Sequence, residues 1–154
     1  MIVEGINHSV INFTDVKWTN KALLDSYDFM ESDLTNYSNR LRILADKTYD
    51  FGSFPIFISQ HTRIYRLSPI GVVGRLETAK NHDYVYNGVD YYFMMKKLDS
   101  VTKSIANEKK ALFIDLSSNT EWCDNDFYDW CHNTPQGCQK VGSHICKSIE
   151  HLLK

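Results

Sequence analysis

Two side chains near the C-terminal end of the chain have the types and the spacing of a hydrolytic acid–base pair. Asp129 and His132 are three residues apart in a segment that reads Asp-Trp-Cys-His-Asn-Thr-Pro-Gln-Gly over residues 129–137. At this spacing in a turn, a carboxylate can accept a hydrogen bond from one imidazole nitrogen while the other nitrogen faces a cleft. The same spacing also fits a surface ion pair or a turn cap, so spacing alone leaves these alternatives open.

A second polar segment follows the first apolar run of the chain. Residues 2–4 predict a short strand, and Gly5 and Asn7 come directly after it. In open α/β sheets, ligands bind beyond the carboxyl ends of the strands. Because this segment and the one that holds His132 each follow a predicted strand, both are expected near a ligand-binding edge.

The elements that must position these residues alternate between strand and helix. Apolar side chains three and four residues apart predict amphipathic helices over about residues 19–49, 89–109 and 138–152. Continuous apolar runs at residues 55–59 and 111–116 predict buried strands, the first of them covered on both faces. The alternating order predicts a parallel sheet covered by helices.

Residues 60–86 show no hydrophobic period, because Pro69, Gly71 and Gly74 interrupt it. A connection of this length inside a compact domain is often a lid or a substrate wall. Aromatic side chains gather at its end and at the start of the next predicted helix, where they either stack a sugar ring or pack in the core. These are Tyr84, Tyr86, Tyr91, Tyr92 and Phe93.

The C-terminal segment resembles the last conserved block of the SGNH (GDSL-type) hydrolases. In that family the block reads Asp-x-x-His, then a residue pair, Pro, one further residue, Gly and an amphipathic helix. Here Asp129, His132, Pro135 and Gly137 stand at the matching positions. The match in both residue types and spacing makes this the most specific part of the resemblance.

Other segments are similar to the same family in the same order. Gly5 and Asn7 resemble its Gly-x-Asn block, and residues 54–60 and 111–116 resemble two of its strands. The resemblance covers nearly all of the 154 residues. It implies a single domain, residues 1–154, with a flavodoxin-like three-layer α/β/α sandwich fold and a truncated parallel sheet.

The resemblance also implies a role for each matching residue. His132 would be the general base, Asp129 the carboxylate that orients it, and Asn7 a side-chain donor in the oxyanion hole. The implied activity is that of a serine esterase that hydrolyses an acyl ester, such as an acetyl ester of a carbohydrate. Neither a metal nor an organic cofactor is expected, because Ser-His-Asp catalysis needs neither.

The sequence departs from the family at the nucleophile. The family's Gly-Asp-Ser block and the block that supplies an oxyanion-hole Gly are both absent, and Ser9 is the only serine near the start. We therefore expect a domain that lacks its N-terminal strands and that is inactive alone, because no acyl-enzyme forms without a nucleophile.

The alternative is a non-catalytic α/β remnant that binds a ligand or associates with itself. Without the family's first strands, the strand at residues 2–4 would be an edge with unpaired backbone groups, and such edges pair readily with another chain. A homodimer formed through this edge strand is the partner expected under this interpretation.

Composition argues against several classes of protein. The 17 Lys and Arg residues face 19 Asp and Glu residues, which gives a formal net charge of −2. No nucleic-acid partner is expected, because binding phosphates needs a concentrated positive face. No membrane partner is expected either, since no apolar run approaches roughly 18–20 residues. Without the basic and apolar segments of a signal peptide, a soluble, cytoplasmic location is the default expectation.

The four cysteines all lie toward the C-terminal end, at Cys123, Cys131, Cys138 and Cys146. Reduced thiols are expected in a chain of this length without a signal peptide. The spacings lack the close Cys pairs typical of zinc sites, so no metal is expected. A zinc-stabilised interaction module built from Cys123, Cys131, Cys138 and a His is a third interpretation.

Overall fold

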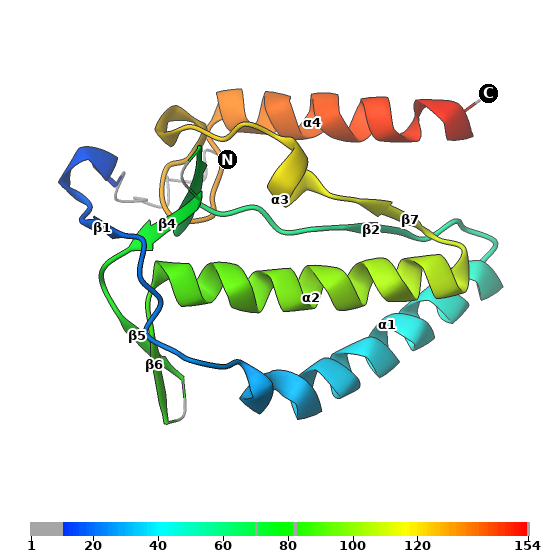
Figure 1. Ribbon diagram of the computed structural model, residues 1–154. Coiled ribbons are helices and arrows are strands. Elements are labelled where there is room, and N and C mark those ends of the chain that lie inside the picture. The colour runs from blue at the N-terminus through cyan, green and yellow to red at the C-terminus, as the bar shows by residue number, and fades with distance from the viewer. Residues whose placement is uncertain (1–10, 70, 82, 154) are drawn as a thin grey trace, which may run out of the picture.

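The computed structural model describes residues 11–69, 71–81 and 83–153, arranged as Figure 1 shows. The described chain is of the mixed α/β class, as predicted. Its helices are α1 (Glu31–Asp50), α2 (Gly88–Lys109), α3 (Leu116–Asn119) and α4 (Pro135–Ile149), with 3-10 helices η1 (Phe13–Asp15), η2 (Asp28–Met30), η3 (Asp124–Asp126) and η4 (Glu150–Leu152). Its strands are β1 (Trp18–Thr19), β2 (Ile56–Ile58), β3 (Tyr65–Ser68), β4 (Gly71–Arg75), β5 (Ala79–Asn81), β6 (Tyr84–Tyr86) and β7 (Leu112–Ile114).

Two of the predicted strands form a parallel pair. In β2 and β7, Ile56 lies opposite Leu112 and Ile58 opposite Ile114. Figure 1 shows this pair between α2 on one side and α3 and α4 on the other. The parallel pairing that the sequence predicted for these two runs is confirmed.

The β2 strand is covered on one face only, which corrects the expectation that both faces are buried. Phe57 is 8% exposed, whereas Ile56 and Ile58 are 39% and 40% exposed. Successive side chains on a strand point to opposite faces, so the core receives Phe57 alone.

The core below this strand is formed by α1 and α2. Phe57 packs in a cluster with buried side chains of both helices, namely Leu41, Ala45, Ile105 and Ala106. Ala45 and Ala106 are completely buried, and their small side chains let the two helices approach each other closely. The helix predicted at residues 89–109 is confirmed almost residue for residue by α2.

Residues 60–86 are more regular than the sequence predicted. β3 and β4 form an antiparallel hairpin, with Ser68 opposite Gly71, and β1 adds to the other side of β4. A second hairpin joins β5 and β6, with Ala79 opposite Tyr86. The glycines that interrupt the hydrophobic period therefore belong to turns and close contacts of a small sheet.

The first helix begins later than residue 19, where the sequence predicted it, because the side chain of Asp90 binds the residues that precede α1. The Asp90 carboxylate accepts hydrogen bonds from the backbone N–H groups of Leu23 and Leu24 and from the Tyr27 hydroxyl, at 3.0–3.1 Å. Asp90 is fully buried and also accepts the backbone N–H of Asn87, which caps α2. This segment is thus held in an irregular conformation, and α1 starts only at Glu31.

Two glycines bring β4 against the start of α2. A Cβ atom on Gly74 would lie 2.1 Å from the carbonyl carbon of Gly88 and from the nitrogen of Val89. A Cβ atom on Gly88 would lie 2.3 Å from the nitrogen of Arg75. Any side chain at either position would force the strand and the helix apart.

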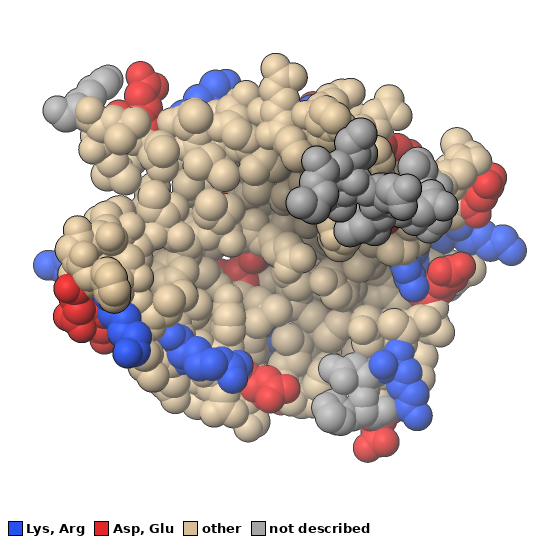
Figure 2. All heavy atoms as spheres, turned by 180° about the vertical axis from the view of Figure 1, so that it is seen from behind, with Lys and Arg blue, Asp and Glu red and all other residues tan. Residues whose placement is uncertain are grey.

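Within the described residues, we find no helix that is both long and apolar enough to cross a bilayer. Figure 2 shows one face of the molecule, which is mostly uncharged apart from a small acidic patch near its centre, with basic and acidic side chains along its lower rim. The predicted strand at residues 2–4, and with it the expected dimer edge, lies outside the described residues.

Candidate active site

The loop that holds the candidate acid–base pair is closed at its base by backbone hydrogen bonds. Phe127 and Asn133 form an isolated antiparallel bridge, and the N–H of Tyr128 donates to the carbonyl of His132 at 2.8 Å. Phe127 is 3% exposed and anchors the loop in the interior. The residues between these contacts are therefore presented at the surface on a fixed backbone.

The structure brings Asp129 and His132 together as the sequence predicted. The Oδ2 atom of Asp129 lies 2.7 Å from Nδ1 of His132. The other carboxylate oxygen, Oδ1, accepts the backbone N–H groups of Cys131 and His132, each at 2.9 Å. The carboxylate is thus oriented by the backbone on one side, and it orients the imidazole ring with the other.

These contacts keep Asp129 ionised. Partial burial alone would raise the pKa of Asp129, but the two backbone hydrogen bonds and the contact with His132 lower it to about 2. The side chain of Asp129 is 23% exposed and that of His132 is 60% exposed. A permanently charged carboxylate therefore faces an imidazole that solvent can reach.

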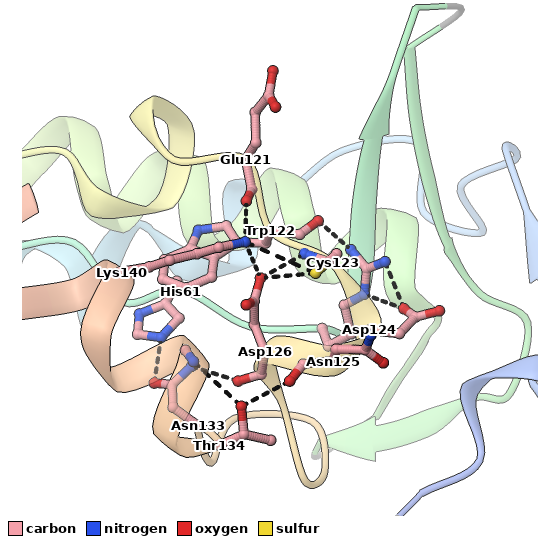
Figure 3. Close-up of polar contacts among 12 residues, drawn as sticks. His61, Glu121, Trp122, Cys123, Asp124, Asn125, Asp126, Asn133, Thr134 and Lys140 are labelled. Atoms are coloured by element: carbon pink, nitrogen blue, oxygen red, sulfur yellow. Dashed lines mark hydrogen bonds and ion pairs between the residues drawn. The ribbon is translucent and has the colours of Figure 1, made fainter. Parts of the chain in front are cut away.

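The residue after His132 is held by a second histidine, His61, which comes from the end of the strand predicted at residues 55–59 (Figure 3). Nδ2 of Asn133 donates to the carbonyl of Asp126 at 3.1 Å, so Oδ1 of Asn133 is the acceptor for Nε2 of His61 at 2.7 Å. The His61 ring also stacks on Trp122, with ring centroids 4.2 Å apart. His61 follows β2, so it connects the parallel pair to the loop.

An ion pair between a buried carboxylate and a partly exposed lysine fixes the loop to α4. Asp126 is fully buried, and its Oδ2 atom accepts hydrogen bonds from Nζ of Lys140 at 2.6 Å and from the backbone N–H of Cys123 at 2.8 Å (Figure 3). Burial raises the pKa of Asp126, but the bonds from Lys140 and Cys123 outweigh it, and the net shift is downward. Nζ of Lys140 also donates to the carbonyl of Glu121 at 3.1 Å.

The Pro-x-Gly part of the segment forms the start of α4. Thr134 caps the helix by accepting the N–H of Gly137, and Pro135 occupies the first turn. A Cβ atom on Gly137 would lie 2.2 Å from the carbonyl oxygen of Asp126. Gly137 is therefore needed for close packing, and α4 begins before the predicted residue 138.

A cavity of about 540 Å³ lies between α2 and the end of β2. Aromatic side chains and a few polar groups line it, among them Tyr84, Tyr86, Tyr91, Gln60 and Asp99. Gln60 directly precedes His61, and burial, Tyr86 and the nearby Cys131 raise the pKa of Tyr91. None of the described residues of the loop that carries His132 lines the cavity, and Tyr91 is the lining residue that senses the charge of this loop.

The aromatic cluster noted in the sequence divides between two places. Tyr84, Tyr86 and Tyr91 line the cavity. Tyr92 instead packs on Tyr65, with ring centroids 5.0 Å apart, and Phe93 packs on Tyr27 at 5.8 Å. Packing against another aromatic side chain is thus shown for Tyr92 and Phe93, whereas stacking of a sugar ring stays a prediction for the three residues that line the cavity.

The other predicted site residues are not brought into this geometry. Asn7 and Ser9 lie outside the described residues. Cys131 has its sulfur 3.8 Å from Nδ1 of His132, the nitrogen that Asp129 already binds, so it is not aligned as a nucleophile for the other nitrogen. In the described part of the chain, Cys123 and Cys138 do not join Cys131 in a metal-binding group, which argues against the three-cysteine zinc module.

Three residues that support the loop could not have been assigned from the sequence. His61, Asp126 and Lys140 are far apart along the chain and follow no shared spacing. Only the position of His61 at a strand end gave a signal.

Comparison of the chain with protein-family models, with curated proteins and with solved structures yields no match.

Proposed function

We propose that this chain is a hydrolase domain of the SGNH type for acyl esters, with His132 as general base. Because the family's Gly-Asp-Ser block is absent, catalysis by this chain alone requires another serine as the nucleophile. The observation that carries the proposal is the 2.7 Å contact between Oδ2 of Asp129 and Nδ1 of His132, with Oδ1 of Asp129 held by two backbone N–H groups. These two backbone bonds also form the turn cap that the spacing allows. They hold the carboxylate in the direction in which its other oxygen orients the imidazole for proton transfer.

The proposed reaction uses the two nitrogens of His132 differently. Nδ1–H donates to Asp129, so Nε2 accepts the proton of a serine hydroxyl as that oxygen attacks the ester carbonyl. The charge on the resulting imidazolium is stabilised by Asp129, and Asn7 donates to the oxyanion. His132 then returns the proton to the departing alcohol, and water attacks the acyl-enzyme by the same route in reverse.

The cavity gives the substrate a place. Its aromatic lining at Tyr84, Tyr86 and Tyr91 suits an apolar or ring-shaped part of the ester, and Gln60 and Asp99 offer polar contacts. A carbohydrate ester combines a ring face with hydroxyl groups, which is why an acetylated sugar is the substrate class we favour. The position of the β2–β7 pair between α2 and α4 supports the three-layer, flavodoxin-like arrangement for the same proposal.

The proposal is tested by covalent labelling with a fluorophosphonate, which reacts with an activated serine. Intact-mass and peptide analysis of the labelled chain identifies the serine that reacts, whichever it is. We expect His132→Asn to slow labelling and hydrolysis of an aryl acetate by about 100-fold or more, because a general base supplies at least that factor. His151→Asn, at an exposed position outside the loop, is the matched control.

Failure of labelling in the unmodified chain, together with no turnover of the aryl acetate, would overturn the proposal. The non-catalytic alternative would then take its place, and a stable dimer in size-exclusion chromatography with light scattering would support it. Labelling that survives His132→Asn would also count against the assigned base.

A further inference from the structure

Three different metal-binding side chains converge on one point of the loop. Asp129, Cys131 and His132 each present one ligand atom, and these atoms all lie within 4.8 Å of one another. The contact from Nδ1 of His132 to the Asp129 oxygen is 2.7 Å, and that to the Cys131 sulfur is 3.8 Å. No other group of three such side chains is found among the described residues.

The spacing of these atoms is close to that in a tetrahedral zinc site. Bonds of about 2.0 Å to oxygen and nitrogen and about 2.3 Å to sulfur separate the ligand atoms by roughly 3.3–3.6 Å. The observed contacts fall on either side of this range. Small rotations of the exposed Cys131 and His132 side chains would bring the ligand atoms into this range.

The loop also supplies the support that a metal site needs. Oδ1 of Asp129 is fixed by the N–H groups of Cys131 and His132, so the remaining oxygen is already directed at the shared point. Hydrogen bonds of this kind to a ligand raise metal affinity. The thiol of Cys131 is exposed, and the bridge between Phe127 and Asn133 keeps all three residues on one backbone loop.

We propose that Asp129, Cys131 and His132 bind one divalent cation of the zinc class. The ligands are a carboxylate oxygen, a thiolate sulfur and Nδ1 of the imidazole. A sulfur–nitrogen–oxygen set selects a soft or borderline cation over calcium or magnesium, which prefer oxygen ligands. The two negative charges of the ligands balance the charge of the cation, and a water molecule completes its coordination.

The cation switches off the base. It replaces the hydrogen on Nδ1 and parts that nitrogen from Asp129, so the remaining ring hydrogen sits on Nε2. An Nε2–H group cannot accept a proton from a nucleophile. This regulatory consequence rests on the proposed function, whereas the binding of the cation does not.

Titration of the full chain with Cd²⁺ in a non-thiol reductant tests the site directly. Cadmium bound to a thiolate absorbs in the ultraviolet, and we expect this band to saturate at one equivalent and to disappear when Zn²⁺ displaces the cadmium. Cys131→Ser removes the proposed thiolate ligand and should abolish the band. Cys138→Ser removes another exposed thiol and should leave the band unchanged.

Nitrogen-15 shifts of the His132 ring identify the bound atom, because coordination at Nδ1 leaves the hydrogen on Nε2. No thiolate band in the unmodified chain, or a band that persists in Cys131→Ser, overturns the metal site. A normal band in a chain that shows neither labelling nor hydrolysis retains the metal site and rejects the hydrolase. Where hydrolysis is present, Zn²⁺ should inhibit it, and the ratio of activities with and without Zn²⁺ should approach one in Cys131→Ser.

Discussion

At the scale of single residues, the two oxygens of Asp129 have different roles in the site. One oxygen accepts two backbone N–H groups and cannot turn away without leaving them unpaired. The other oxygen thereby has a fixed direction toward Nδ1 of His132. A single side chain thus transmits the rigidity of the loop backbone to the imidazole ring.

Asp129→Asn should preserve the fold and invert the tautomer of His132. The two backbone N–H groups require the oxygen of the new amide, so its NH₂ group faces Nδ1 and the ring hydrogen moves to Nε2. We expect the rate of hydrolysis to fall by about 10³-fold or more. Nitrogen-15 shifts report the tautomer whether or not a substrate is known. An unchanged tautomer, with exposed Asp83→Asn as the control, would contradict the assigned orientation.

His61 should make the stability of the protein sensitive to pH. Burial lowers the pKa of His61 from 6.5, although the bond to Asn133 and the charge of Asp126 act in the opposite direction. The unfolded chain therefore binds more protons than the folded chain as the pH falls below that ordinary value. The contribution of His61 to stability is complete above it and is lost as the pH drops through the lowered pKa.

Chemical denaturation between pH 7.5 and 5, a range chosen around the ordinary histidine pKa of about 6.5, measures this effect. We expect the free energy of unfolding to fall toward the acidic end in the unmodified chain and to fall less in His61→Gln. The comparison uses the slope with pH, because the loss of the stack on Trp122 lowers stability at every pH. His151→Gln, at an exposed position, should keep the full slope.

At the scale of secondary structure, elements were predictable where their signal was local. The helix at residues 89–109 and the two parallel strands follow from hydrophobic periodicity and from short apolar runs. The start of α1 does not, because Asp90 binds Leu23 and Leu24 across 67 and 66 residues of sequence. The hydrophobic pattern of residues 19–30 cannot indicate a carboxylate that is so distant in the sequence.

Removal of that carboxylate should be costly. Asp90→Ala leaves the partly buried N–H groups of Leu23 and Leu24 and the buried N–H group of Asn87 without their acceptor. We expect the free energy of unfolding to fall by about 3 kcal/mol, from the lost charged hydrogen bonds and the unpaired donors. Urea denaturation measures it, and Asp25→Ala, an exposed residue of the same segment, should change stability by less than about 0.5 kcal/mol. Equal effects of the two substitutions would refute the role of Asp90.

At the scale of the whole molecule, the candidate site was only half accessible from the sequence. Asp129 and His132 were predictable because they are three residues apart in one turn. Their support was not, since His61 meets Asn133 across 72 residues of sequence. The antiparallel sheet was missed for a related reason. Its strands β1, β4 and β3 have only two, five and four residues, and glycines interrupt β4, so the hydrophobic periodicity is too short to be recognised before the partners are known.

The contact between Gly74 and Gly88 also bears on the order in which the molecule folds. It joins β4 and the start of α2, which are close together in the sequence, whereas the strands of the β2–β7 pair are separated by the whole of α2 and the hairpins before it. Closing a short loop costs less entropy than closing a long one. The corner between β4 and α2 is therefore expected in the rate-limiting transition state, and the parallel pair is expected after it.

Stopped-flow refolding with conservative deletions separates the two regions. Val89→Ala, at the 2% exposed start of α2, should mainly slow folding, whereas Ile114→Val, at the 2% exposed end of β7, should mainly speed unfolding. The reverse assignment would place the nucleus in the parallel pair. His61 follows β2 and His132 lies beyond β7. The candidate site is therefore expected to form last, after Gly74 and Gly88 have brought β4 and α2 together.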